Sequence, residues 1–366
     1  MSTVGPPTLA PPPYAPPPPR RRHGCRTALL IGGIVTLVLL VVGAVGIVVL
    51  LRNLATPHKV PADYRPPAAL PVAPATAAIP PGDLVFDSDR TGNYEIFTMT
   101  GTGQTPRQLT DDSRYDSWWA RLSPDRRTIL FYRSPKGSHD RDYSSTSLWA
   151  IGADGSEPTL VRPAGLDGWV LQGHAEWSPD GTRLVMFGGS RSRPQIQITD
   201  RQGQNPTAIT DRGGSNVDPS WSPDGSTIVF SGCPGQICKP SDHEIYTVAA
   251  TGGPVTRLTD DGLADNDPYY SHSGTQLAWL TKVSGILPGV WDIRIAPADG
   301  SDPRRLIGDD RINSKPSWSL DDTTIFFHRL DTATAKGFQI WAVAPDGSDL
   351  RQITTDQPGA NEYPGT

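Results

Sequence analysis

Acidic residues are missing from the first 60 residues of the chain, and this absence divides the sequence into two unlike parts. All 38 acidic residues lie beyond that point, together with 27 of the 33 lysines and arginines. The longer part is therefore acidic overall. A nucleic-acid-binding face needs an excess of positive charge to neutralise phosphates. The charge balance thus argues against a nucleic-acid partner.

Signatures of catalysis and of metal binding are also missing. The sequence has no Gly-x-Ser-x-Gly motif, which would present a hydrolase nucleophile. Its histidines lack the paired spacing of a zinc site. The oxygen-rich stretch 260–267 lacks EF-hand spacing, and such Asp and Asn residues commonly cap loops. We predict no catalytic residue, no metal ligand and no cofactor, with calcium at 260–267 left open.

Cysteine is scarce, with three residues in the whole chain. Cys25 precedes the long apolar run, where an inert thiol and a reversibly acylated one are both compatible with the sequence. Cys233 and Cys238 are close together and lack the Cys-x-x-Cys spacing of a redox pair. We predict a local disulfide between these two if the domain is outside the cytoplasm, and free thiols otherwise.

The apolar run covers residues 28–51 without a charged side chain, which is long enough to cross a bilayer as a helix. Four arginines, at 20, 21, 22 and 26, precede it, and only Arg52 follows at once. The positive-inside rule then places the N-terminus in the cytoplasm and the rest outside. A cleaved signal peptide would have a shorter apolar region and a small-x-small cleavage site. We predict one transmembrane helix at 27–52.

Proline sets the character of the segments on either side of this helix. Proline tracts fill residues 1–19, which predicts an extended tail without a core. Residues 53–80 are rich in proline and alanine, which is typical of a semi-rigid linker. The predicted organisation is a basic cytoplasmic tail at 1–26, a membrane helix at 27–52, a linker at 53–80 and a folded domain at 81–366.

The folded domain contains a repeated turn sequence. Trp-Ser-Pro-Asp-Gly occurs at 177–181 and at 221–225, and altered copies occur at 122–125, 270–274 and 318–322. Pro, Asp and Gly are the residues that a tight turn requires. Alternating strands and Asp-Gly hairpin signals fill each repeat, which makes each unit about four strands. A period of about 45–55 residues is typical of a propeller blade.

The ends of the domain predict the number of blades. Five units carry the turn, and a sixth begins near 338 and stops at 361–366 before its turn. Residues 83–88 have the pattern of the strand that follows a turn. We therefore predict an all-β, six-bladed propeller of four-stranded blades, closed by pairing of the N-terminal strand with the C-terminal blade. This closure would also cover exposed sheet edges.

The pairing of Pro-x-Trp-Ser-Pro-Asp-Gly with residues 88–97 resembles the TolB-type propeller repeats, also called WD40-like or PD40 repeats. The resemblance covers about residues 82–366. It implies partner binding at the mouth of the channel, where the strand before Pro-x-Trp lines the opening. The candidate binding residues on that strand are Gln172, His174, Asn216, Asp218, Asp265, Asp267, Asn313, Lys315, Asn361 and Tyr363.

These features predict a single-pass membrane protein that carries a TolB-like propeller outside the cell membrane as a non-catalytic binding module. Its partner would be a protein or a polymer of the cell envelope. An alternative is a propeller enzyme of the glycosidase, lyase or lactonase kind, which would use carboxylates at the channel mouth or a calcium ion. A third is a sensor, although the short tail carries no signalling domain. The sequence does not fix the oligomeric state.

Overall fold

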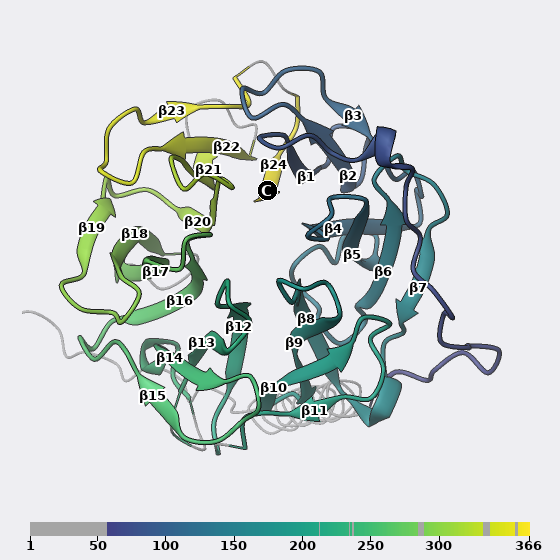
Figure 1. Cartoon of the computed structure of the whole chain (residues 1–366), viewed down its shortest axis with the longest axis horizontal. Helices are drawn as coiled ribbons and strands as arrows, with labels where there is room; N and C mark the ends of the chain where they lie inside the picture. The colour runs from purple at the N-terminus through teal and green to yellow at the C-terminus, as the bar shows by residue number, and fades with distance from the viewer. Residues whose placement is uncertain are drawn as a thin grey trace, which may run out of the picture. The chain divides into compact units, whose positions relative to one another are not determined.

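In a computed structural model, the described residues are 57–366, apart from 212, 234, 236–237, 285–288, 332–336 and 356–357. Within this part of the chain, 24 strands form six four-stranded antiparallel sheets. The sheets stand side by side in a ring, as blades around a central axis (Figure 1). The predicted six-bladed propeller of four-stranded blades is confirmed, and we name its blades A to F in chain order.

The first three blades each extend from an innermost strand beside the central axis to an outermost strand at the rim. Blade A consists of β24 (Asn361–Gly365), β1 (Leu84–Ser88), β2 (Glu95–Met99) and β3 (Arg107–Gln108). Blade B consists of β4 (Tyr115–Leu122), β5 (Thr128–Pro135), β6 (Ser147–Gly152) and β7 (Thr159–Arg162). Blade C consists of β8 (Leu171–Trp177), β9 (Arg183–Ser190), β10 (Arg193–Asp200) and β11 (Thr207–Ala208).

The other three blades follow the same order. Blade D consists of β12 (Asn216–Trp221), β13 (Thr227–Gly232), β14 (Glu244–Ala249) and β15 (Val255–Arg257). Blade E consists of β16 (Ala264–Tyr270), β17 (Gln276–Ser284), β18 (Val290–Pro297) and β19 (Arg304–Ile307). Blade F consists of β20 (Asn313–Trp318), β21 (Ile325–Asp331), β22 (Gly337–Val343) and β23 (Arg351–Gln352). Three single-turn 3-10 helices lie at Ala75–Ala77, Leu166–Gly168 and Pro240–Asp242.

The ring closes through pairing of the two ends of the domain. β24 pairs antiparallel with β1, with Asn361 opposite Ser88 and Gly365 opposite Val85. The last strand thus supplies the innermost position of a blade whose other three strands come first in the chain. This is the predicted closure, and β24 lies beside the central axis in Figure 1.

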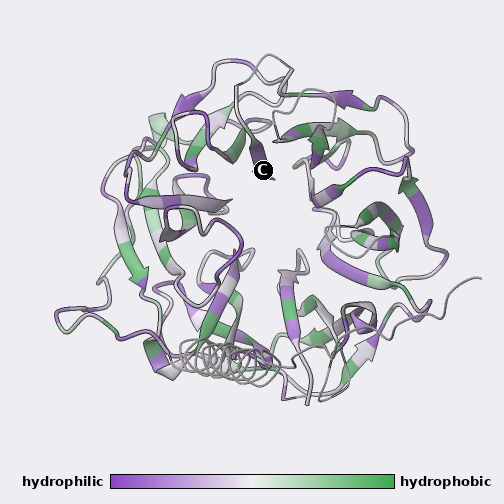
Figure 2. Cartoon of the chain, turned by 180° about the vertical axis from the view of Figure 1, so that it is seen from behind, coloured by the Kyte–Doolittle hydropathy of each residue, from purple (hydrophilic) through white to green (hydrophobic). Residues whose placement is uncertain are grey.

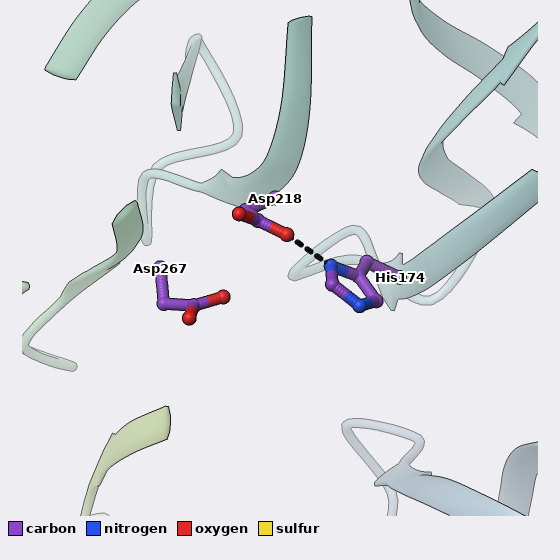
Figure 3. A group of neighbouring side chains, drawn as sticks. All are labelled: His174, Asp218 and Asp267. Carbon is purple, nitrogen blue, oxygen red and sulfur yellow. Dashed lines mark ion pairs between the residues drawn. The ribbon is translucent and has the colours of Figure 1, made fainter. Parts of the chain in front are cut away.

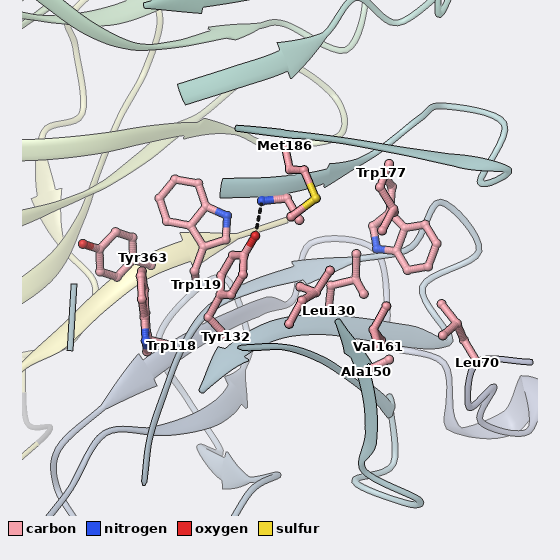
Figure 4. Close-up of a cluster of buried hydrophobic side chains, with 13 residues drawn as sticks. Leu70, Trp118, Trp119, Leu130, Tyr132, Ala150, Val161, Trp177, Met186 and Tyr363 are labelled. Carbon is pink, nitrogen blue, oxygen red and sulfur yellow. Dashed lines mark hydrogen bonds between the residues drawn. The ribbon is translucent and has the colours of Figure 1, made fainter. Parts of the chain in front are cut away.

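The hydrophobic core is divided among the junctions between blades. Buried apolar side chains form a separate cluster at each junction, from the A–B cluster to the F–A cluster. The B–C cluster is the most aromatic, and Trp118, Trp119, Tyr132 and Trp177 belong to it together with Met186 (Figure 4). Hydrophobic segments follow the strands, and hydrophilic segments are frequent in the loops (Figure 2). Each sheet thus buries both faces against its neighbours, which a lone blade could not do.

Residues 57–80, in the segment whose composition is typical of a semi-rigid linker, pack against the folded domain. We call them the strap, because they pack along the propeller. Leu70, Ala73 and Ile79 are buried in the clusters at the B–C and A–B junctions. The backbone N–H groups of Ala73 and Ile79 donate to carbonyls of Arg127 and Arg126, both at 3.0 Å. Prolines and alanines are compatible with this extended, hydrogen-bonded path, so the composition alone did not predict it.

The predicted membrane helix at 27–52 lies outside the described residues. Among the residues that the structure does describe, no helix has the length and the hydrophobicity to cross a bilayer.

Candidate functional site

One residue on each innermost strand adopts a left-handed backbone conformation. These six residues are Trp119, His174, Asp218, Asp267, Lys315 and Tyr363, with φ between 51° and 58°. Each lies where the pairing with the second strand shifts register. A bulge of this kind redirects a side chain that would otherwise follow the strict alternation of a strand. We call the six residues the bulge ring.

The bulge-ring side chains contact one another inside the channel. The Trp119 and His174 rings stack with centroids 3.8 Å apart, and Trp119 lies 5.2 Å from Tyr363. The Lys315 ammonium lies 4.6 Å from the Trp119 ring centre and 3.9 Å from Asp218 Oδ1. It also forms an ion pair with Asp267. All six residues are largely buried, so the ring closes the channel instead of lining an open mouth.

The charges in the bulge ring are balanced within it. Burial and the Lys315 charge hold the pKa of His174 well below its usual value, so the imidazole is neutral against the Asp218 carboxylate (Figure 3). Burial alone would lower the pKa of Lys315, but Asp267, Asp218 and Asp140 raise it above its usual value. Burial, with the neighbouring Asp218 charge, raises the pKa of Asp267 to about 6. The ring thus holds one permanent cation between two carboxyl groups.

The bulge ring also contains a potential set of metal ligands. Ligand atoms of His174, Asp218 and Asp267 lie within 4.8 Å of one another. An imidazole with two carboxylates suits several divalent ions. Lys315 places its own ammonium against both carboxylates, where a bound ion would need them. The lysine thus serves as a built-in cation.

A second polar layer lies two residues further along the innermost strands. Arg121 Nε is 2.5 Å from Glu176 Oε1, and its Nη2 donates to the Tyr269 hydroxyl at 3.1 Å. That hydroxyl donates to Glu176 at 3.2 Å. The Arg121 guanidinium also lies 4.0 Å from the centre of the Trp119 ring, so the two layers are in direct contact. We call these three residues the floor triad.

Above the floor triad lies a cavity of about 420 Å³, which we call the funnel. Aromatic side chains from four blades line it: Trp177, Trp221, Tyr270 and Trp318. Leu320 also lines it. Leu320 is 41% exposed, although it is a large apolar residue. The funnel thus combines apolar walls with a charged floor, which is the usual make-up of a ligand pocket.

The repeated turns surround the funnel and interlock from blade to blade. Where a turn ends in glycine, that glycine faces the proline of the turn before it. A Cβ atom added at Gly181 would lie 3.6 Å from Pro124, and one at Gly274 would lie 3.5 Å from Pro223. Glycine is needed there both for its positive φ and for this approach. We call the ring of turns the collar.

Two junctions of the collar use side chains in place of glycine. Arg126 occupies the glycine position with φ of 58°, and its guanidinium donates to the carbonyls of Ile79, Pro80 and Asp83 at 2.7–2.9 Å. Asp322 occupies it in blade F, also with φ of 58°. Asp322 accepts the backbone N–H groups of His272 and Ser273. In both junctions, hydrogen bonds thus replace the packing of glycine on proline.

A loop closes the other end of the channel. Residues 136–146, between β5 and β6, bring His139, Asp140 and Tyr143 into contact with His174 and Tyr363 of the bulge ring. His139 Nε2 lies 2.8 Å from Asp87 Oδ2, and the Tyr143 hydroxyl lies 2.8 Å from His174 Nε2. Asp140 accepts the hydroxyls of Tyr143 and Tyr363. We call this loop the lid. A cleft of about 670 Å³ beside it is lined by Tyr94, His139 and Glu362.

The predicted binding residues divide into two sets. His174, Asp218, Asp267, Lys315 and Tyr363 meet in the bulge ring. The other five face the blade junctions or their own sheets: Gln172, Asn216, Asp265, Asn313 and Asn361. Their partners are the Thr146 carbonyl, Gln195, Thr281, Arg329 and Gln339 respectively. These contacts support blade packing.

Sequence reasoning missed Trp119, the floor triad and the lid. Trp119 occupies the bulge position of blade B, but Ala120 follows it where blades A, D, E and F have proline, so the Pro-x-Trp pattern did not mark it. Cys233 and Cys238 form a disulfide in the β13–β14 loop, with Cα atoms 6.0 Å apart.

The fold and channel define a six-bladed β-propeller with a polar, closed axis. It is similar to TolB-type propellers: residues 170–283 match the family described as TolB beta propeller domain. The Tol-Pal system protein TolB of Bordetella pertussis is 27% identical over 72% of this chain and 59% of its own length. An uncharacterized protein of Agrobacterium fabrum, Atu1656, is 28% identical over 49% of this chain and 60% of its own.

Among solved structures, TolB from Acinetobacter baumannii superposes with a TM-score of 0.60. It is 17% identical, over 78% of this chain and 66% of that one, so the likeness supports the fold alone. The chain spans about 60% of the length of the curated relatives it matches.

Proposed function

We propose that this chain is a non-catalytic binding module of the cell envelope, and that a segment of a partner protein binds in the funnel. The funnel's composition carries this proposal. Its aromatic walls could bury an apolar side chain of a partner, and the floor triad offers charged hydrogen-bonding groups. Aromatic pockets of this kind dominate the energetics of protein–protein binding. The similarity to Tol-Pal system proteins supports a protein over a polymer as the partner.

The proposal includes the membrane anchor that the sequence predicts. In it, residues 1–26 remain in the cytoplasm, 27–52 cross the bilayer, and the propeller is outside the cytoplasm, beyond the 53–80 segment. The disulfide between Cys233 and Cys238 supports an oxidising compartment for the propeller. The charge asymmetry around 27–52 supports the orientation.

An enzymatic role receives less support from the same channel. Acid–base catalysis needs a carboxyl or imidazole group that can approach the substrate. Glu176 is held by Arg121, and Asp267 is held by Lys315. A substrate would first have to displace these internal cations. The pairing of the buried carboxylates therefore supports binding over catalysis.

The test uses a photo-crosslinking amino acid in the full chain, expressed in membranes of its native host. One variant carries it at Leu320, on the funnel rim, and the matched control carries it at Leu350. The two leucines are equally exposed, at 41% and 42%, but Leu350 is not among the funnel residues. We expect a discrete adduct from position 320 alone. Equal adducts from both positions, or none from 320, would contradict the proposal.

A further inference from the structure

A hydrogen-bonded trio recurs at the blade junctions. At the C–D junction, Gln195 Oε1 accepts the Thr210 hydroxyl at 2.8 Å and the Asn216 amide at 2.9 Å. At the F–A junction, Gln339 Oε1 accepts the Thr354 hydroxyl at 2.8 Å and the Asn361 amide at 3.0 Å. The asparagine belongs to the innermost strand of the next blade. An N–H donor therefore joins each of these pairs of blades.

The D–E junction keeps the spacing of this trio but replaces its amides with acids. Glu244 takes the place of glutamine and accepts the Thr259 hydroxyl at 2.7 Å. Asp265 takes the place of asparagine, and a carboxylate has no N–H to donate. Asp261 adds a third carboxylate. Ligand oxygens of the three residues lie within 4.8 Å of one another.

Nearby arginines neutralise two of these three acids. Arg257 Nη2 lies 2.7 Å from Glu244 Oε1, and Arg294 Nη1 lies 2.8 Å from Asp261 Oδ2. Asp265 has no such cation among the described residues: its Oδ1 accepts the Thr281 hydroxyl at 2.5 Å. Its Oδ2 is buried and has no hydrogen-bond partner among the residues that the structure describes.

The side chain of Asp265 is fully buried. As an anion, a carboxyl group in such a place, facing two others, is strongly unfavourable unless a proton or a metal ion neutralises it. The unpartnered oxygen of Asp265 lies where the three carboxylates converge. A cation bound at this point would supply the partner that Oδ2 lacks and would offset the repulsion among the three acids.

We propose that Glu244, Asp261 and Asp265 bind a calcium ion that bridges blades D and E. Calcium prefers oxygen ligands and tolerates irregular geometry, with water completing its coordination. The site has three carboxylates from two segments, β14 and residues 261–265, and no sulfur ligand, which suits a hard cation. By joining β14 to β16, the ion would replace the N–H link that the C–D and F–A junctions use.

The test measures calcium binding to the full chain, purified in detergent and freed of ions with EDTA. Calcium chloride alone is titrated by calorimetry, and thermal unfolding is followed in parallel. We expect one ion to bind to the wild type and to raise its Tm by several degrees, because the ion binds only the folded state.

The decisive variant is D265N, which rebuilds the asparagine of the C–D and F–A junctions. It should unfold at a Tm equal to or above that of the calcium-free wild type, because the amide of the substituted side chain can donate to Glu244. Its calcium affinity should fall at least tenfold, with loss of the Tm shift. E157Q removes an exposed acid in blade B and should bind calcium as the wild type does. Absence of calcium binding by the wild type, or equal binding by D265N, would overturn the proposal.

Discussion

The carboxylate of Asp322 accepts the backbone N–H of His272 at 2.7 Å, across the junction between blades E and F. The same carboxylate accepts the N–H of Ser273 at 2.8 Å. In the preceding junction the equivalent positions are Pro223 and Gly274, which touch through packing alone. Proline has no N–H, and glycine has no acceptor side chain. The two substitutions from the repeat pattern thus compensate for each other.

This compensation predicts a specific pattern in a double-mutant cycle. H272P removes the donor and leaves Asp322 in a left-handed conformation without that bond, so we expect a loss of about 1–2 kcal/mol in the free energy of unfolding. D322G relieves the backbone but loses both bonds. The double variant H272P/D322G rebuilds the proline–glycine junction, and its stability should lie within about 1 kcal/mol of the wild type. Urea unfolding of all four proteins measures this, and simple additivity of the single losses would contradict it.

A second prediction concerns Arg126, whose guanidinium binds backbone carbonyls of the strap and of Asp83. Glycine at this position would remove the positive-φ cost of about 1 kcal/mol. It would also remove three hydrogen bonds from a charged, buried side chain to backbone carbonyls, each of which contributes about 1 kcal/mol or more. We therefore expect R126G to be less stable by about 2 kcal/mol, with residues 57–80 cleaved sooner in limited proteolysis.

R126K is the matched control for this test. It keeps the charge and the strained backbone but lacks the planar fork of donors. Its stability and its rate of cleavage should fall between those of the wild type and R126G. An R126G protein as stable as the wild type, with an unchanged cleavage rate, would show that the guanidinium does not hold the strap.

The parts of this fold that the sequence predicted are those fixed by local chemistry. Pro, Asp and Gly at the turn positions specify the turn wherever it occurs, so the repeats revealed six blades. The pattern of residues 83–88 revealed the closing strand. The strap escaped prediction because its partners, Arg126 and Arg127, lie far along the chain. Composition describes what a segment can do alone, and not what it packs against.

The candidate site was only half predictable for a related reason. Asn216 and Asp218 are two residues apart and would share one face of a regular strand. The bulge at Asp218 breaks this alternation, so Asp218 enters the channel and Asn216 faces Gln195. The lid likewise has no periodic signal. Its role depends on contacts with Asp87 and His174, which belong to other blades.

The lid should be sensitive to pH. Burial disfavours the charge on His139, but Asp87, Glu362 and Asp140 raise the pKa of His139 to about 9. Its unfolded value is about 6.5. The protonated imidazole therefore stabilises the folded state fully below about pH 6.5, and this contribution disappears as the pH rises through about 9. Burial also raises the pKa of Glu362 to about 7, so its titration removes stability as the pH rises from about 4.5 to 7.

We expect the wild type to lose roughly 3 kcal/mol of unfolding free energy between about pH 6.5 and pH 9.5, from the shift at His139. H139Q retains an N–H donor but cannot titrate, and its stability should be flatter over this range. Amide hydrogen exchange of residues 136–146 in the wild type should accelerate with pH. Its increase should be steeper than the increase of the intrinsic exchange rate of unprotected amides. Equal slopes for both proteins would exclude His139 as the titrating group.

Removal of the internal cation gives the sharpest test of the bulge ring. K315M leaves Asp218 and Asp267 buried together without an ammonium, and breaking a buried pair in this way costs about 3–5 kcal/mol. The loss should be smaller at about pH 5 than at about pH 8, because protonation of Asp267 removes one of the two charges.

Manganese or zinc should restore part of the lost stability of K315M by binding His174, Asp218 and Asp267 in place of the lysine. K136M, at an exposed lysine of the lid, is the control and should show neither effect. If the free energy of unfolding of K315M changed with neither pH nor added metal, the stability of the bulge ring would not depend on the lysine charge.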